Sequence, residues 1–199
     1  MKSEPRAIIG KVFSSIEGEA QYAGLPTFFV HVADGHKKTV SQCLETLLSE
    51  PVVVLDTCEA VYFPWQEFAH AFLFHVQSLK RIAVLETRGE KDLSPYLSTA
   101  KTIYLNYTLG TTHDGNLNFL RQCDQVKFLC YDIEEFKEMT FIMNEVCKKT
   151  SAVCYVMPRG LSVAETGEFF DAFRTLKHAR VLSEDLRIGL IVHELLGIE

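Results

Sequence analysis

Short apolar runs with strand propensity alternate along this chain with stretches of helical periodicity. The predicted strands cover residues 27–32, 52–55, 82–86, 102–105, 126–130 and 152–157, with a further strand over 7–13. Strands that alternate with helices are typical of an α/β fold in which most of the strands run parallel. This alternation therefore predicts an α/β protein built on one mostly parallel sheet.

Four stretches have the apolar spacing of amphipathic helices. They are residues 40–49, 65–79, 133–147 and 162–177. Residues 33–38, Ala-Asp-Gly-His-Lys-Lys, are polar and predict a turn between the first long strand and the first helix. The chain has no internal repeat and no linker-like tract, so its 199 residues predict a single domain over 1–199.

Composition excludes several classes of protein. The formal net charge is −6 and the pI is near 5.7, which argues against a dedicated nucleic-acid binder. Apolar runs are too short to span a membrane, and the first residues lack the apolar core of a signal peptide. We therefore expect a cytoplasmic protein, in which the six cysteines are reduced thiols.

Two charged residues stand next to or inside predicted strands. Glu86 ends one strand, and parallel sheets bind ligands at the carboxyl ends of their strands. It is either a pocket residue or a loop carboxylate paired with Lys91. Lys127 lies within an apolar strand and needs a partner if it is buried. It either faces the pocket, where it pairs with an anionic ligand or Glu86, or it pairs at the surface with Asp124.

Short motifs are distributed over nearly the whole chain. They read Phe13-x-Ser15-Ile16-Glu17-Gly18-Glu19-Ala20, Gly24-Leu25-Pro26, Phe29-Val30, Glu86-Thr87-x-Gly89, Asp124-Gln125-Val126-Lys127-Phe128, and a tail with His193, Leu196, Gly197 and Ile198. In this combination the chain resembles 7-carboxy-7-deazaguanine synthase, a radical-SAM enzyme that makes the deazapurine precursor of queuosine. The resemblance implies a small, modified, partly open α/β barrel. It also implies a set of ligand-binding residues: Glu17, Gly18, Glu19, Glu59, Glu86, Thr87, Lys127 and His193.

Members of that family hold a [4Fe–4S] cluster with three cysteines spaced C-x3-C-x2-C. Here the three positions fall on His36, Val40 and Cys43, so the spacing is kept and two thiolates are lost. Valine has no lone pair, and one imidazole with one thiolate does not complete the ligand set. The family's glycine-rich loop for S-adenosylmethionine is also altered, because Thr57 and Cys58 replace its two glycines.

We therefore expect a cluster-less homologue with no bound metal and with neither [4Fe–4S] nor S-adenosylmethionine as cofactor. Such a pseudoenzyme would bind a purine-like or deazapurine ligand or a protein partner. One alternative is an active synthase that uses S-adenosylmethionine with a non-standard [4Fe–4S] site. Another is an enzyme with non-radical chemistry, which a carboxylate of strongly raised pKa in the pocket would favour. The resemblance also implies a homodimer.

Overall fold

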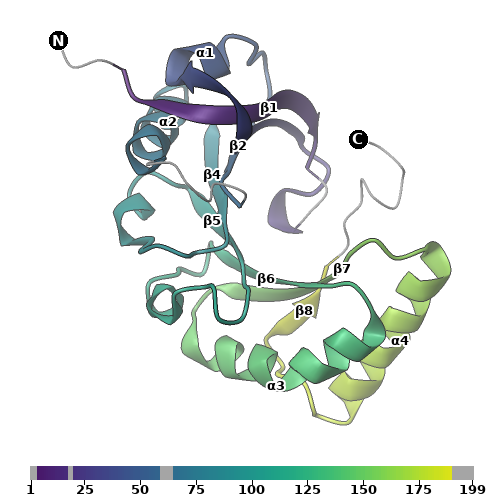
Figure 1. The fold of residues 1–199 in the computed structure, drawn as a ribbon. Helices are drawn as coiled ribbons and strands as arrows, with labels where there is room; N and C mark the ends of the chain where they lie inside the picture. Colours follow the sequence, from purple (N-terminus) through teal and green to yellow (C-terminus); the bar gives the residue numbers. More distant parts are fainter. Residues whose placement is uncertain (1–3, 18–19, 59–64, 190–199) are drawn as a thin grey trace.

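The described residues form one curved sheet of eight strands at the centre of the protein (Figure 1). The computed structural model describes residues 4–17, 20–58 and 65–189. The strands are neighbours in chain order: β1 (Arg6–Ile16), β2 (Pro26–Thr39), β3 (Val52–Asp56), β4 (Ile82–Thr87), β5 (Thr102–Asn106), β6 (Gln125–Cys130), β7 (Val153–Pro158) and β8 (Leu186–Ile188). Strands β1 and β2 pair antiparallel and every other neighbouring pair is parallel. Within the described residues the sheet curls but does not close, since β1 and β8 are not paired with each other.

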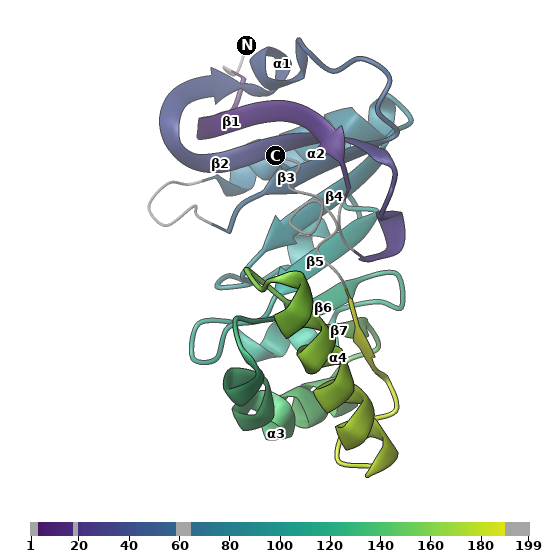
Figure 2. The ribbon, with the colours of Figure 1, turned by 90° about the vertical axis from the view of Figure 1, so that its right-hand side faces the viewer.

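Helices cover the outer, convex face of the sheet. They are α1 (Val40–Leu44), α2 (Gln66–Ser78), α3 (Ile133–Lys149) and α4 (Val163–His178), with short 3-10 turns at Ala20–Tyr22, Ser94–Tyr96 and Asp114–Asn118. Figure 2 shows α3 and α4 together at the end of the molecule opposite the β1–β2 hairpin. No helix in the described parts of the chain has both the length and the apolar character of a membrane span.

The two faces of the sheet are buried in different ways. On the outer face, alternate strand residues such as Val53 and Leu55 pack with Phe68 and Phe72 of α2 in the large apolar core. On the inner face, a second, smaller apolar cluster consists of Val52, Val54, Val84 and Tyr104. Burial on both faces explains why these strands read as continuous apolar runs.

The predicted strands and helices are present, and two of the helices begin at a capping residue. Asp132 precedes α3 and accepts a hydrogen bond from the backbone of Glu135 at 2.7 Å. Ser162 and Glu165 form a complete capping box at the start of α4. The short strand β8 is an element that the sequence did not predict.

The predicted turn at residues 33–38 is wrong. These residues continue β2 to Thr39 and pair with the start of β1, where Ile9 faces both Val32 and His36 in an irregular register. A Cβ atom on Gly35 would lie 2.2 Å from the carbonyl oxygen of Ile9, so only glycine permits this close approach. The first helix is also shorter than the predicted 40–49. It ends at Leu44, and Leu48, which was predicted on its apolar face, is exposed.

Candidate functional site

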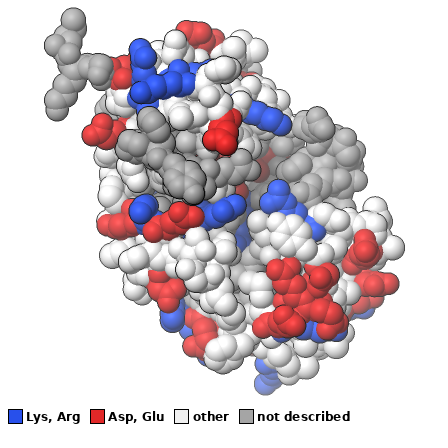
Figure 3. All heavy atoms as spheres, in the orientation of Figure 1, with Lys and Arg blue, Asp and Glu red and all other residues white. Residues whose placement is uncertain are grey.

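A cavity of about 1510 Å³ opens at the carboxyl ends of the parallel strands. Its wall comes from the inner side of β1 and β2, from the ends of β3, β4 and β5, and from α3. In Figure 3 the molecule is hollowed near its centre, with Lys and Arg atoms around the hollow. Lys11, Arg88 and Arg159 are the basic residues among those that line it. This is the edge of an open α/β sheet at which ligands generally bind.

A buried ion pair forms the floor of the cavity. The ammonium group of Lys127 donates to Glu86 Oε1 at 3.1 Å and lies 4.2 Å from the centre of the Tyr104 ring. The Asn106 amide donates to the same Glu86 oxygen at 3.0 Å and to Cys58 Sγ at 3.1 Å. Lys127 is 1% exposed, whereas the Glu86 side chain is 18% exposed and lines the cavity. Lys127 thus pairs with Glu86 from outside the cavity lining.

The two carboxylates of the site differ in their electrostatics. Burial raises the pKa of Glu86, but the Lys127 charge and the hydrogen bonds from Asn106 and Lys127 outweigh it, so this pKa lies below its usual value of 4.5. Asp56 faces Glu86 across neighbouring strands. Burial raises the pKa of Asp56, and repulsion from Glu86 raises it further. The pKa values of these two adjacent carboxyl groups are therefore shifted in opposite directions, that of Glu86 downward and that of Asp56 upward.

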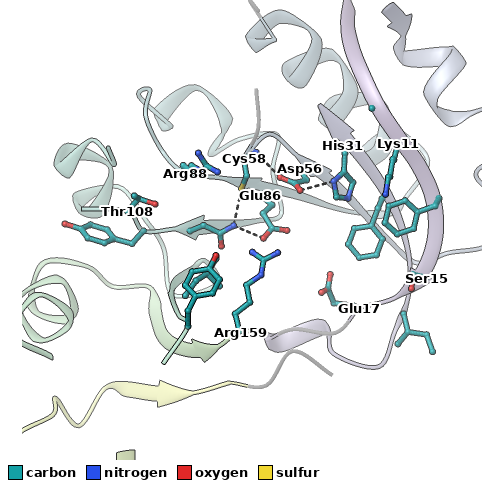
Figure 4. Close-up of a pocket in the computed structure, with 18 of the residues that line it drawn as sticks. Lys11, Ser15, Glu17, His31, Asp56, Cys58, Glu86, Arg88, Thr108 and Arg159 are labelled. Carbon is teal, nitrogen blue, oxygen red and sulfur yellow. Dashed lines mark hydrogen bonds and ion pairs between the residues drawn. The ribbon is translucent and has the colours of Figure 1, made fainter. Parts of the chain in front are cut away.

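Asp56 also forms an ion-pair contact with His31, on the side away from Glu86. The Nδ1 atom of His31 lies 3.3 Å from Asp56 Oδ2, and the backbone N–H of Cys58 donates to Asp56 Oδ1 at 2.9 Å. Figure 4 shows His31 and Asp56 turned toward each other on the wall of the cavity. The Cys58 thiol also lies in the cavity wall, where burial and then the charges of Asp56 and Glu86 raise its pKa well above the usual value. Cys58 is therefore a neutral thiol rather than a reactive thiolate.

Aromatic rings form the wall on the side of β1 and β2. Phe13 stacks on Phe29 with ring centres 5.2 Å apart and planes inclined by 15°. The imidazole of His31 lies 5.4 Å from the ring of Phe13. All three residues line the cavity, and Tyr107 and Tyr131 line it from other elements. The cavity thus combines flat apolar surfaces with a polar end.

The predicted site residues have different places in the structure. Glu17 is buried and lines the cavity, as Glu86 does. Lys127 pairs with Glu86, as one of the two interpretations proposed, while Asp124 is held by Arg121 at 2.8 Å. Thr87 is buried outside the cavity lining and accepts a hydrogen bond from the backbone of Gly89. The remaining predicted residues lie outside the described part of the chain: Gly18, Glu19, Glu59 and His193.

The three family cluster positions do not form a cluster site here. His36 is an exposed residue of β2, paired in register with Ile9. Val40 and Cys43 are buried in α1, and burial raises the pKa of the Cys43 thiol to about 11. A thiol that holds its proton this strongly is a poor ligand, and Val40 supplies no donor. The donor set therefore does not fit a [4Fe–4S] cluster.

Elsewhere in residues 4–17, 20–58 and 65–189, no three His, Cys, Asp or Glu side chains are arranged to hold a metal ion. All six cysteines belong to these described residues, and each is a free thiol. Among the described residues the thiols do not form a preformed set of metal ligands.

Sequence reasoning missed His31, Asp56 and Asn106 as site residues. Asp56 and Asn106 are the last residues of β3 and β5, and His31 interrupts an otherwise apolar run in β2. A polar residue at the end of a buried parallel strand is a signal that could have identified the first two. Which face of β2 His31 occupies depends on the pairing of β2 with β3.

Comparisons with known proteins support the fold. No protein-family model matches the chain, and no curated protein matches its sequence. Among solved structures, the chain is similar to the crystal structure of QueE from Escherichia coli, with a TM-score of 0.65 and 9% sequence identity. The match covers 94% of this chain and 95% of that chain. The expected open, mostly parallel α/β architecture is therefore confirmed: this protein has a QueE-like fold.

Proposed function

We propose that this protein binds a planar purine-like or deazapurine ligand in the cavity and does not carry out a radical-SAM reaction. One observation carries the proposal: the stacked Phe13 and Phe29 rings share the cavity with the polar cluster of Asp56, Glu86 and Asn106. Aromatic faces bind planar rings, and convergent polar groups read the edges of those rings. The QueE-like fold supports a ligand of this class, since QueE is a 7-carboxy-7-deazaguanine synthase.

The polar end is suited to a ring that carries N–H donors. Asn106 Oδ1 is buried and has no hydrogen-bond partner among the described residues, so it offers an acceptor to a ligand. Asp56 and Glu86 add carboxylate acceptors beside it. Guanine-like rings present an amino group and a ring N–H on one edge, and these donors would satisfy such acceptors.

The absence of radical chemistry in the proposal is based on the residues at the cluster positions. Reductive cleavage of S-adenosylmethionine needs a cluster as electron donor, and side chains alone do not supply it. His36, Val40 and Cys43 do not form a three-thiolate set. The side chains of Thr57 and Cys58 further occupy the loop in which the family has glycines. Thr57 is buried, and its hydroxyl donates a hydrogen bond to the backbone carbonyl oxygen of Glu86. Cys58 lines the cavity.

Calorimetric titration tests the ligand class. We expect guanine and 7-carboxy-7-deazaguanine to bind, and uracil to bind at least about tenfold more weakly, because a single ring has less stacking area. Phe13→Ala should weaken purine binding at least about tenfold. Phe141→Ala is the matched control, because Phe141 is 73% exposed on α3 and does not line the cavity. Equal loss in both variants, or no purine binding at all, would contradict the proposal.

Anaerobic reconstitution with iron and sulfide tests the cluster-less part separately. We expect no stoichiometric iron and no reducible cluster in the EPR spectrum. About four irons per chain with a reducible cluster would contradict it and would favour an active synthase with a non-standard site. A homodimer stays a prediction, and light scattering on the purified protein measures the mass in solution.

A further inference from the structure

We infer that His31 and Asp56 form an acid–base pair that transfers protons to and from the ligand in the cavity. His31 Nδ1 lies 3.3 Å from Asp56 Oδ2, and both side chains line the cavity. The inference uses the cavity of the proposed function but not the identity of its ligand. Neither residue is among the ligand-binding residues that the resemblance to 7-carboxy-7-deazaguanine synthase implies.

Strand register holds the carboxylate in place. His31 of β2 pairs with Asp56 of β3, and Asp56 pairs with Glu86 of β4, so the three side chains form one row. The backbone N–H of Cys58 holds Asp56 Oδ1 at 2.9 Å, which directs Oδ2 toward the imidazole. A carboxylate fixed by the backbone is a rigid orienting group, as the orienting carboxylate is in other acid–base pairs.

The orientation determines which imidazole nitrogen is available. A carboxylate beside Nδ1 favours the tautomer with hydrogen on Nδ1, and the lone pair is then on Nε2. The His31 side chain is 33% exposed and lies beside the Phe13 ring, so a ring stacked on this aromatic wall would be within its reach. His31 is therefore the catalytic residue of the pair and Asp56 its positioning residue.

Charged groups of both signs surround the imidazole. Lys11 on β1 is the cross-strand neighbour of His31, while Asp56 on β3 and Glu86 on β4 are the nearby carboxylates. Burial, followed by repulsion from Glu86, raises the pKa of Asp56, so its anion gains from a positive imidazolium beside it.

The step is balanced without an oxidant or a reductant. His31 Nε2 takes a proton from a C–H or N–H group of a planar heterocycle, and the electron pair stays in the conjugated ring. The imidazolium then returns the proton to another ring atom, so that the substrate is isomerised. The expected substrate class is a bicyclic heteroaromatic acid whose conjugate base is delocalised.

A chromogenic base-elimination probe, 5-nitrobenzisoxazole, tests the base directly. The base removes the C3 proton, the C–H electron pair completes a nitrile, and the N–O bond breaks to release a coloured phenolate. We expect the wild-type protein to accelerate this reaction and His31→Gln to lower kcat/KM at least about 100-fold. His36→Gln is the matched control on the same strand, since His36 lies outside the cavity lining, and it should retain the wild-type rate.

Nitrogen-15 NMR provides a second test that needs no ligand. In the wild type we expect neutral His31 to carry its hydrogen on Nδ1, and in Asp56→Asn we expect that preference to be lost. The pH profile of the elimination rate should differ between the wild-type protein and Asp56→Asn. A purely structural role of Asp56 would leave both the tautomer and the profile unchanged.

The outcomes distinguish this inference from the proposed function. Equal elimination rates for wild type and His31→Gln, including no acceleration by either, overturn the acid–base pair. If both proteins still bind guanine in that case, the proposed binding function stands. If neither binds guanine but elimination depends on His31, the acid–base pair stands and the proposed ligand class fails.

Discussion

Replacement of Lys127 with methionine isolates the contribution of the buried ion pair beneath the cavity. Methionine keeps most of the volume of the lysine stem, but it removes the charge that faces both Glu86 and the Tyr104 ring. Glu86 then keeps its Asn106 hydrogen bond at 3.0 Å and loses its cation. The variant therefore leaves a carboxylate without the charge that compensates its burial.

The size of the effect follows from the exposure of the two partners. Removal of one partner of a fully buried ion pair costs about 3–5 kcal/mol of unfolding free energy. Lys127 is 1% exposed, but the Glu86 side chain is 18% exposed and borders the cavity, from which water can hydrate it. We therefore expect a loss at the lower end, about 3 kcal/mol, at neutral pH.

The loss should depend on pH with a defined sign. In the wild type the pKa of Glu86 is lowered from 4.5, so its stabilisation is present above pH 4.5 and is lost as pH falls through the folded-state pKa. In Lys127→Met, burial is no longer opposed by the lysine, and the carboxyl group should bind its proton more strongly. Acid then neutralises the uncompensated charge, so the difference between the two proteins should shrink toward about pH 5.

Urea unfolding measures both quantities, with fluorescence of the single tryptophan, Trp65, as the signal. Trp65 is buried and stacks with Tyr96, so its emission should report unfolding. Lys91→Met is the control, because Lys91 is the exposed lysine that the sequence alone offered as a partner for Glu86. A loss of unfolding free energy below about 1 kcal/mol at neutral pH would refute a stabilising role of the ion pair, and so would a loss of equal size at neutral pH and at about pH 5.

Three further substitutions have expected effects on the free energy of unfolding, each measured by urea unfolding. Gly35→Ala places a Cβ atom 2.2 Å from the Ile9 carbonyl oxygen and should cost about 2 kcal/mol or more; an unchanged midpoint would contradict the close approach. Gly167→Ala on α4 meets no atom within 4 Å and should stabilise by about 0.5–1 kcal/mol, and a loss would contradict helix propensity as the cause. Asn116→Ala removes three hydrogen bonds to the backbone of Gly89, Lys91 and Leu93 and should cost about 3 kcal/mol; a cost below 1 would mean that water replaces them.

The sequence predicted the elements of the fold better than their ends. The apolar runs that became β3 to β7 are buried on both faces, and such burial requires continuous apolar sequence. The segment 33–38 was predicted as a turn because its residues are polar and include Gly35. It is a strand because β1 supplies hydrogen-bond partners from the other end of a long hairpin. The local propensity of residues 33–38 cannot predict this pairing, because the partner residues lie elsewhere in the chain.

The candidate site shows the same division. The sequence placed Glu86 at a strand end and required a partner for Lys127, because a buried lysine must be paired. The resemblance implied Thr87 as a ligand-binding residue, but Thr87 follows Glu86 directly, so its side chain points to the opposite face of β4, outside the cavity lining. His31 was not identified, because its role comes from a register that aligns it with Asp56 across two strands.

The sequence by itself determined the fold class, the apolar core of each strand and the loss of the cysteine ligand set, since these depend on residue types and their spacing. Only the tertiary structure decided which polar side chains meet. Strand pairing brings His31, Asp56 and Glu86, from three separate segments of the chain, into one row in the lining of the cavity. The physical reason is that hydrogen-bond register between strands sets these neighbours, and burial then sets the charges that they can carry.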